Sequence, residues 1–294
     1  MKSSAQPTLD STSDFIPIRN LKYHVRRWGA RDKPMLFLTH GWLDVSETMH
    51  LMVQPLLARF QVLAPDWRGL GLTEWPQDGY WFPDYVGDLE AVIDHYSPAQ
   101  PVLLAGHSMG AQAASLYAGL RATRVAKLIL MDALFLPDMP AELAPRRYRD
   151  WLEDLKDLPQ PLHYASFEEL AQRVKKKHPQ LSDERALFVA RCWGRARDDG
   201  RVHLLADPKH RLNGPGLFRV AESIEIWKQV AAPTLFLDAG KSIFRQALSK
   251  EELERRRSCF RGRHEQVIEQ AGHMLHFDEP EATGRAMLEF LVNG

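Results

Sequence analysis

The sequence predicts an α/β fold in which a mostly parallel, twisted sheet is flanked by helices and interrupted by a long insertion. Short apolar runs bounded by turn residues alternate with stretches in which apolar residues return every three or four positions. Apolar runs of this kind are typical of parallel strands that are covered on both faces. The strand pattern then stops between Leu134 and Gln229, which indicates the insertion.

The elements of the fold follow from these patterns in chain order. Strands are expected at Met35–Thr39, Gln61–Ala64, Val102–Ala105, Lys127–Met131, Thr234–Leu237 and Gln266–Glu269, with an earlier pair within Phe15–Trp28. Helices are expected after Ser46 and at Tyr85–Tyr96, Met109–Leu120 and Glu281–Val292. The order is a series of βαβ units.

The insertion is rich in Arg, Lys, Asp and Glu, with scattered Trp, Leu and Phe. A structureless loop of this length is uncommon in a compact domain, so the segment should contain helices of its own. We therefore expect a core formed by residues 1–134 and 230–294, and a helical cap formed by residues 135–229.

The charge balance argues against a nucleic-acid or membrane partner. Lys plus Arg equals Asp plus Glu at 38 each, and the fractions of hydrophobic (45%) and charged (26%) residues are those of ordinary globular proteins. The basic runs Lys175–Lys177 and Arg255–Arg257 have acidic neighbours, which predicts solvated helix faces. The expected partner is a small molecule, bound by a monomer or homodimer.

The sequence gives no sign of export or membrane insertion. Met1–Asp14 is polar and lacks the apolar run of a signal peptide, and no stretch is long enough to span a bilayer. Cys192 and Cys259 lie far apart and outside any CxxC pattern. We expect a cytoplasmic protein in which neither cysteine carries chemistry and no metal or organic cofactor is needed.

The motif that carries chemistry is Gly-His-Ser-Met-Gly at residues 106–110. It follows a predicted strand and precedes a predicted helix. A serine in a sharp strand-to-helix turn is strained and exposed, and glycines two residues away on each side avoid collisions in that turn. The alternative, a plain Gly-rich turn, does not explain this placement, so Ser108 is the expected nucleophile.

Two further loops fit the same chemistry. His40-Gly41-Trp42 ends the strand at Met35–Thr39, and the backbone N–H groups of Trp42 and Met109 are candidates for binding a negative carbonyl oxygen. The alternative is a structural turn with Trp42 in the core. His273 follows the last strand and is the expected base, because its unperturbed pKa lies near neutrality. His276 is the weaker candidate, and a surface role for His273 is the alternative.

With these motifs in place, most of the chain resembles the α/β-hydrolase superfamily, and in particular serine-hydrolase-like proteins. The resemblance rests on residues 40–44, 66–71, 106–110, 128–133 and 272–273. It implies an α/β-hydrolase fold and the order nucleophile, acid, histidine along the chain. The insertion carries no comparable motif, so the substrate is not implied.

The chain departs from the family pattern at the acid. Where the family usually has a carboxylate after the strand Thr234–Leu237, this chain has Gly-Lys-Ser-Ile at residues 240–243. Two substitutes are open, Asp132 at the end of the strand after the motif helix, and Asp238 just after Leu237. Certain haloalkane dehalogenases resemble this chain in placing the acid at the Asp132 position, which favours Asp132. A dyad, or a purely structural role for either residue, is the alternative.

The resulting hypothesis is a serine hydrolase that cleaves a small carboxylic ester through an acyl-enzyme. His40, Trp42, Met109, Trp151 and Trp193 are expected to line the substrate pocket. Cleavage of a carbon–carbon bond next to a ketone is the main alternative within enzymes, and a non-catalytic small-molecule receptor is the alternative outside them. A serine nucleophile counts against dehalogenase or epoxide-hydrolase chemistry, and the absence of GxGxxG counts against a dinucleotide-binding domain.

Overall fold

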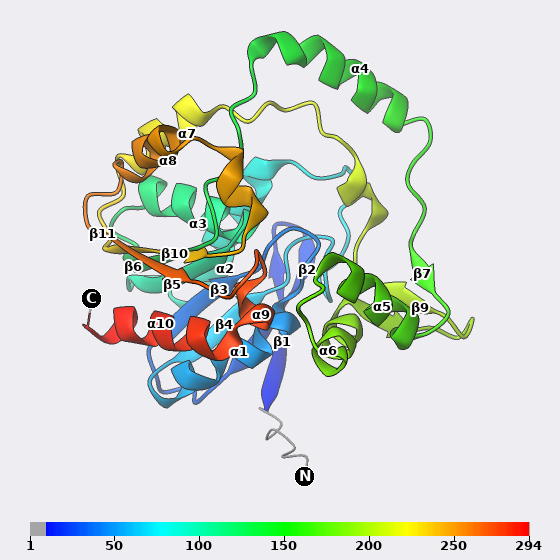
Figure 1. Cartoon of the computed structure of the whole chain (residues 1–294), viewed down its shortest axis with the longest axis horizontal. Coiled ribbons are helices and arrows are strands. Elements are labelled where there is room, and N and C mark those ends of the chain that lie inside the picture. Colours follow the sequence, from blue (N-terminus) through cyan, green and yellow to red (C-terminus); the bar gives the residue numbers. More distant parts are fainter. Residues whose placement is uncertain (1–9, 294) are drawn as a thin grey trace.

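A computed structural model of the chain describes residues 10–293. Its main feature is an eight-stranded sheet with the order β1-β2-β4-β3-β5-β6-β10-β11 (Figure 1). The strands are β1 (Ser11–Ile18), β2 (Leu21–Trp28), β3 (Met35–Thr39), β4 (Gln61–Pro65), β5 (Val102–His107), β6 (Val125–Met131), β10 (Thr234–Ala239) and β11 (Arg263–Ile268). Every strand expected from the apolar runs is present, with ends that differ by a few residues at most.

The sheet is parallel from β4 to β11 and antiparallel at one end. β1 pairs with β2, and β2 with β4, in antiparallel register, whereas the remaining neighbours are parallel. The carboxyl ends of the parallel strands therefore meet at one edge, where ligands bind in open α/β sheets. The mostly parallel sheet predicted from the sequence is confirmed.

Helices cover both faces of this sheet (Figure 1). The long ones are α2 (Phe82–Tyr96), α3 (Met109–Leu120), α7 (Val220–Trp227), α8 (Lys250–Arg257) and α10 (Pro280–Asn293), and α1 (His50–Val53) and α9 (Leu275–Asp278) are single turns. One apolar core joins α2, α3 and α7 to one face of the sheet, and a second joins α1 and α10 to the other. These two cores fix the strand ends that carry the site.

The insertion between β6 and β10 has three parts. Helices α5 (Phe167–Lys177) and α6 (Asp183–Trp193) share a small apolar core with Met274 and Phe277, which lie near His273 in the chain. The short strands β7 (His163–Tyr164), β8 (Gly194–Ala196) and β9 (Val202–Leu204) form a separate antiparallel sheet. Helix α4 (Ala144–Asp154) stands apart from the other helices (Figure 1).

Some expectations change with the structure. The insertion contains this small sheet as well as helices, and α7 at its end belongs to the main core through Trp227. Arg255–Arg257 is not a solvated face, because Arg256 and Arg257 are buried at 1% and 3% exposure and their guanidinium groups bond to backbone oxygens and carboxylates. Residues 1–9 of the polar segment Met1–Asp14 lie outside the described residues. No helix among residues 10–293 is long and apolar enough to cross a membrane.

Candidate active site

Ser108 lies in a sharp turn between β5 and α3. Its backbone has φ 52° and ψ −116°, a strained conformation for a residue with a side chain. Its N–H donates to the Met131 carbonyl at 3.0 Å, which ties the turn to β6. Strand β5 thus ends just before Ser108 and α3 begins just after it. The half-buried hydroxyl lies at the carboxyl edge of the sheet.

The flanking glycines explain why this turn is possible. A Cβ on Gly106 would lie 2.6 Å from the Ala111 nitrogen, and a Cβ on Gly110 would lie 2.5 Å from the His40 carbonyl oxygen. Both obstacles are backbone atoms, so neither can move aside cheaply. Helix α3 can therefore approach both its own strand and the loop after β3 only if these two positions lack side chains.

Ser108, His273 and Asp132 form a continuous hydrogen-bonded chain. His273 Nε2 lies 3.0 Å from Ser108 Oγ, and His273 Nδ1 lies 2.6 Å from Asp132 Oδ2. An ionised carboxylate only accepts hydrogen bonds, so Nδ1 carries the proton and Nε2 turns a lone pair toward the serine hydroxyl. This is the arrangement in which imidazole can remove the serine proton.

Asp132 is held by three donors. Besides His273, it accepts hydrogen bonds from the Ala239 N–H at 3.1 Å and from Ser242 Oγ at 2.5 Å. The carboxylate is 1% exposed, and Asp132 has φ 43°, so the backbone turns sharply just after β6. Ser242 lies in the 240–243 segment that lacks the usual family acid, and here it supports the carboxylate supplied by β6.

Asp238, the other candidate acid, is engaged elsewhere. Both of its oxygens bond to Arg257 Nη2, at 2.7 and 2.8 Å, in a buried ion pair. Burial raises the pKa of Asp238, although the Arg257 guanidinium opposes that effect. The structure brings Asp132 to His273 and places Asp238 against α8.

The two loops proposed to bind the oxyanion meet beside Ser108. Met109 is the first residue of α3, so its N–H has no acceptor within the helix, and the helix N-terminus favours a negative charge. A Cβ on Gly41 would lie 3.2 Å from Ser108 Cβ, which places the loop that continues to Trp42 directly against the nucleophile. The structure therefore brings both loops to the hydroxyl.

A set of buried groups holds the His273 loop in place, and it includes His276, the weaker candidate for the base. His107 Nε2 lies 2.7 Å from the His273 carbonyl oxygen and must donate to it, while His276 Nε2 bonds to Asp44 Oδ2 at 2.9 Å. Burial alone would raise the pKa of Asp44, but the hydrogen bond and charge of His276 hold it below its usual range. Burial also lowers the pKa of His107, which keeps this imidazole neutral.

Among residues 10–293, Asp44, His107 and His276 form one group whose ligand atoms lie within 4.8 Å of one another, close enough to share a metal ion. Each of the three already has a hydrogen-bond partner within the protein. Sequence reasoning could have found His107 from its place next to Ser108, but it offers no local signal for the contact between Asp44 and His276.

A cavity of about 360 Å³ opens next to the nucleophile turn. Its lining is largely aromatic and aliphatic and includes Trp42, Trp81, Met109, Trp151 and Leu155. Three of the five expected pocket residues, Trp42, Met109 and Trp151, therefore lie on one cavity. Apolar walls with a few polar groups are typical of small-molecule sites.

The other two expected pocket residues lie outside this lining. His40 is fully buried and accepts a hydrogen bond from the Trp67 N–H at 3.0 Å. Trp193 donates its indole N–H to Asp44 Oδ1 at 2.8 Å. Both side chains support the loops of the site, because their polar atoms are used to fix neighbouring segments.

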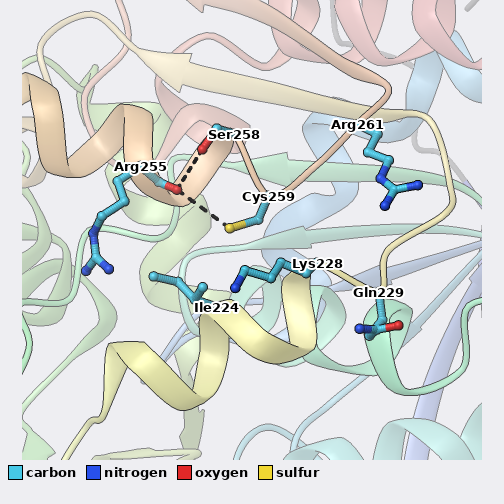
Figure 2. A pocket seen from close by; sticks show the side chains of 7 residues that line it. All are labelled: Ile224, Lys228, Gln229, Arg255, Ser258, Cys259 and Arg261. Atoms are coloured by element: carbon cyan, nitrogen blue, oxygen red, sulfur yellow. Dashed lines mark hydrogen bonds between the residues drawn. The ribbon is translucent and has the colours of Figure 1, made fainter.

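A second hollow, of about 610 Å³, lies between α7 and α8 (Figure 2). Lys228, Arg255 and Arg261 line it, and the Cys259 thiol is 3.6 Å from the Arg255 carbonyl oxygen. Burial raises the pKa of Cys259, which keeps it a thiol rather than a reactive thiolate at neutral pH. Neither Ser108 nor Met109 is among the residues that line this hollow.

This fold and this strand-edge site agree with what comparison with known proteins finds. The chain belongs to the Alpha/beta hydrolase family, whose model matches residues 35–286. Family membership supports hydrolase activity. It also confirms the superfamily resemblance seen in the motifs.

Individual relatives cover nearly the whole chain at low identity. A serine hydrolase-like protein of Danio rerio is 27% identical over 90% of this chain and 83% of its own. The esterase YbfF of Escherichia coli (strain K12) is 23% identical over 92% and 99% of the two chains. A thioesterase domain from the curacin biosynthetic pathway superposes with a TM-score of 0.84 at 24% identity, covering 95% of this chain and 99% of the other. That last likeness is one of fold.

Proposed function

We propose that the protein hydrolyses a carboxylic ester with Ser108 as nucleophile, His273 as base and Asp132 as the acid that orients the base. His273 Nε2 takes the Ser108 proton while Oγ bonds to the carbonyl carbon, and the carbonyl oxygen becomes negative. The backbone N–H groups of Trp42 and Met109 stabilise that charge.

The second half of the reaction returns the enzyme to its starting state. His273 gives its proton to the alcohol oxygen, the carbon–oxygen bond breaks, and an acyl group remains on Ser108. Water then loses a proton to His273 and attacks the acyl carbon. His273 returns that proton to Ser108 Oγ as the acid leaves.

The observation that carries this proposal is the chain of two hydrogen bonds from Ser108 through His273 to Asp132. A strained serine turn alone fits a structural role, and a histidine on a loop alone fits a surface role. Both together at 3.0 Å, with a buried carboxylate behind the imidazole, support nucleophilic catalysis. Relatives described as an esterase and a thioesterase domain point to acyl transfer as the reaction class.

Ser108→Ala tests the proposal on short aryl esters. By analogy with serine proteases, the rate should fall by roughly 10⁴ to 10⁶ while folding is retained. Ser258→Ala is the matched control, because Ser258 is an exposed serine at the end of α8. Equal turnover by wild type and Ser108→Ala would end the proposal.

Two alternatives remain open to direct tests. A receptor on this fold would not react with a fluorophosphonate, whereas an activated Ser108 is expected to be labelled within minutes and the Ser108→Ala protein not at all. The two hydrogen bonds of His273 count against the receptor, which was favoured only by the missing family acid. A carbon–carbon hydrolase would prefer coloured dienoate ring-cleavage products over esters in a side-by-side panel.

A further inference from the structure

Helix α4 has an apolar stripe that is left without a core. Tyr148, Trp151, Leu152 and Leu155 recur at the spacing of one helix face, yet within residues 10–293 no residue of α4 is buried. A separate helix of this length is only marginally stable in water. The stripe therefore needs apolar contacts from another source.

Part of that stripe faces the cavity beside Ser108. Trp151 of α4 and Leu155, which directly follows the helix, line it, and the Trp151 and Trp81 rings meet edge to face at a centroid distance of 6.0 Å. Trp81 and Trp42, which also line the cavity, are 42% and 52% exposed. A molecule bound in this cavity would bury surface of these tryptophans.

The polar groups of the cavity are mostly neutral or already bonded. Tyr80 donates its hydroxyl hydrogen to the buried Asp207 at 2.8 Å. Burial lowers the pKa of His210 to about 4, so the side chains of Tyr80 and His210 are both uncharged at pH 7. Lys209 Nζ donates to two backbone carbonyl oxygens. Asp78 is exposed and can stay in water. Such a chamber favours an uncharged, apolar group.

The chemistry decides which half of the ester lies in this cavity. The departing alcohol oxygen must take its proton from His273, so the alcohol lies on the His273 side, where the Phe244 ring is 4.4 Å away. Trp42 and Met109, whose N–H groups would bind the carbonyl oxygen, line the cavity. Ser108, His273 and Phe244 are not among its lining residues. Since the alcohol lies on the His273 side, the acyl group of the ester is the part that faces the cavity.

We propose that the cavity under α4 holds the acyl group, that the enzyme prefers esters of long uncharged acyl chains, and that Trp151 is a specificity-determining residue. The inference rests on the proposed esterase function. The alcohol side is the more open one, because Ile243 and Phe244 there are 73% and 43% exposed.

Two ester series separate the acyl side from the alcohol side. In p-nitrophenyl esters from acetate to octanoate, kcat/KM should rise about two- to fourfold per methylene, or roughly 16- to 250-fold over the four methylenes from acetate to hexanoate. In acetates of ethanol, butanol and hexanol, kcat/KM should change less than about threefold in total. If kcat/KM does not rise along the acyl series, the proposal is overturned, whatever the alcohol series shows.

Trp151→Ala tests the residue, and Trp75→Ala is its control. Trp75 is a half-exposed tryptophan that lines a different hollow. Trp151→Ala should lower the ratio of hexanoate to acetate kcat/KM by about two- to tenfold, whereas Trp75→Ala should leave it unchanged. Trp151 is not buried, so both proteins should keep the wild-type Tm. An unchanged ratio in Trp151→Ala would show that Trp151 does not determine acyl specificity.

A binding experiment keeps this inference separate from catalysis. The uncharged fluorophore N-phenyl-1-naphthylamine should bind wild type and the Trp75→Ala protein alike, and bind Trp151→Ala several-fold more weakly. If wild type hydrolyses no ester at all, the proposed function fails, but weaker probe binding by Trp151→Ala still supports an apolar site under α4. Equal probe binding by all three proteins would overturn that site whatever the activity.

Discussion

Exchanging Asp132 for Asn should reverse the proton arrangement on His273. The Ala239 N–H requires an acceptor, so the amide oxygen of Asn would face it and the amide NH₂ would replace Oδ2. That NH₂ would then donate to His273 Nδ1, which lies 2.6 Å from Oδ2 in the wild type. Nε2 would carry the proton toward Ser108 and could no longer accept one.

The size of the effect follows from this change of tautomer. In serine proteases, the equivalent exchange leaves the geometry intact and lowers kcat by about 10⁴, equal to about 5.4 kcal/mol of transition-state stabilisation. We expect a loss of the same order here. Ser242 Oγ can rotate to accept from the new NH₂, so the free energy of unfolding should change little.

Asp238→Asn is the matched comparison, because it makes the same chemical change at the other candidate acid. It leaves the buried Arg257 with only the partly exposed carboxylate of Glu265 as a counter-charge, which should cost about 3 kcal/mol of stability and lower the Tm by about 5 to 10 °C. Activity per folded molecule should stay within a few-fold of wild type. Asp132→Asn should therefore lose activity and keep its stability, whereas Asp238→Asn should lose stability and keep its activity.

The assay is kcat on a p-nitrophenyl ester, measured beside thermal unfolding of all three proteins. If Asp132→Asn keeps more than a tenth of the wild-type kcat, the role assigned to Asp132 is wrong. If Asp238→Asn instead loses about 10⁴ in kcat with an unchanged Tm, the acid is Asp238 and the contact with Arg257 is secondary.

Two further predictions concern buried histidines. His107→Leu removes the donor to the His273 carbonyl and should lower kcat about 10- to 100-fold with little change in KM, and His107→Gln, which can donate, should recover part of the loss in the same steady-state assay. The folded-state pKa of His210 is about 4, below the value of about 6.5 expected in the unfolded chain, so its contribution to stability is complete above pH 6.5 and is lost as pH falls toward 4. Urea midpoints between pH 7.5 and 4.5 should therefore fall less steeply in His210→Gln than in wild type, and parallel curves would contradict this explanation.

Much of the fold could be predicted because it depends on local patterns. The apolar runs gave β3 (Met35–Thr39) and α3 (Met109–Leu120) with their observed bounds, since a strand buried on both faces needs a continuous apolar run and a helix needs apolar residues at three- and four-residue spacing. The turn at Ser108 was equally local, because two glycines and a serine between a strand and a helix allow few conformations.

The sequence by itself determined the βαβ order, the nucleophile turn and the histidine loop, because each is encoded within about ten neighbouring residues. Only the tertiary structure decided between Asp132 and Asp238. They lie near the ends of adjacent parallel strands, where Met131 pairs with Leu237, and the choice depends on Arg257 from α8 reaching one of them. It likewise decided that Trp151 lines the cavity and Trp193 does not. These outcomes come from contacts between residues far apart in the chain, such as His273 and Asp132, which local patterns do not record.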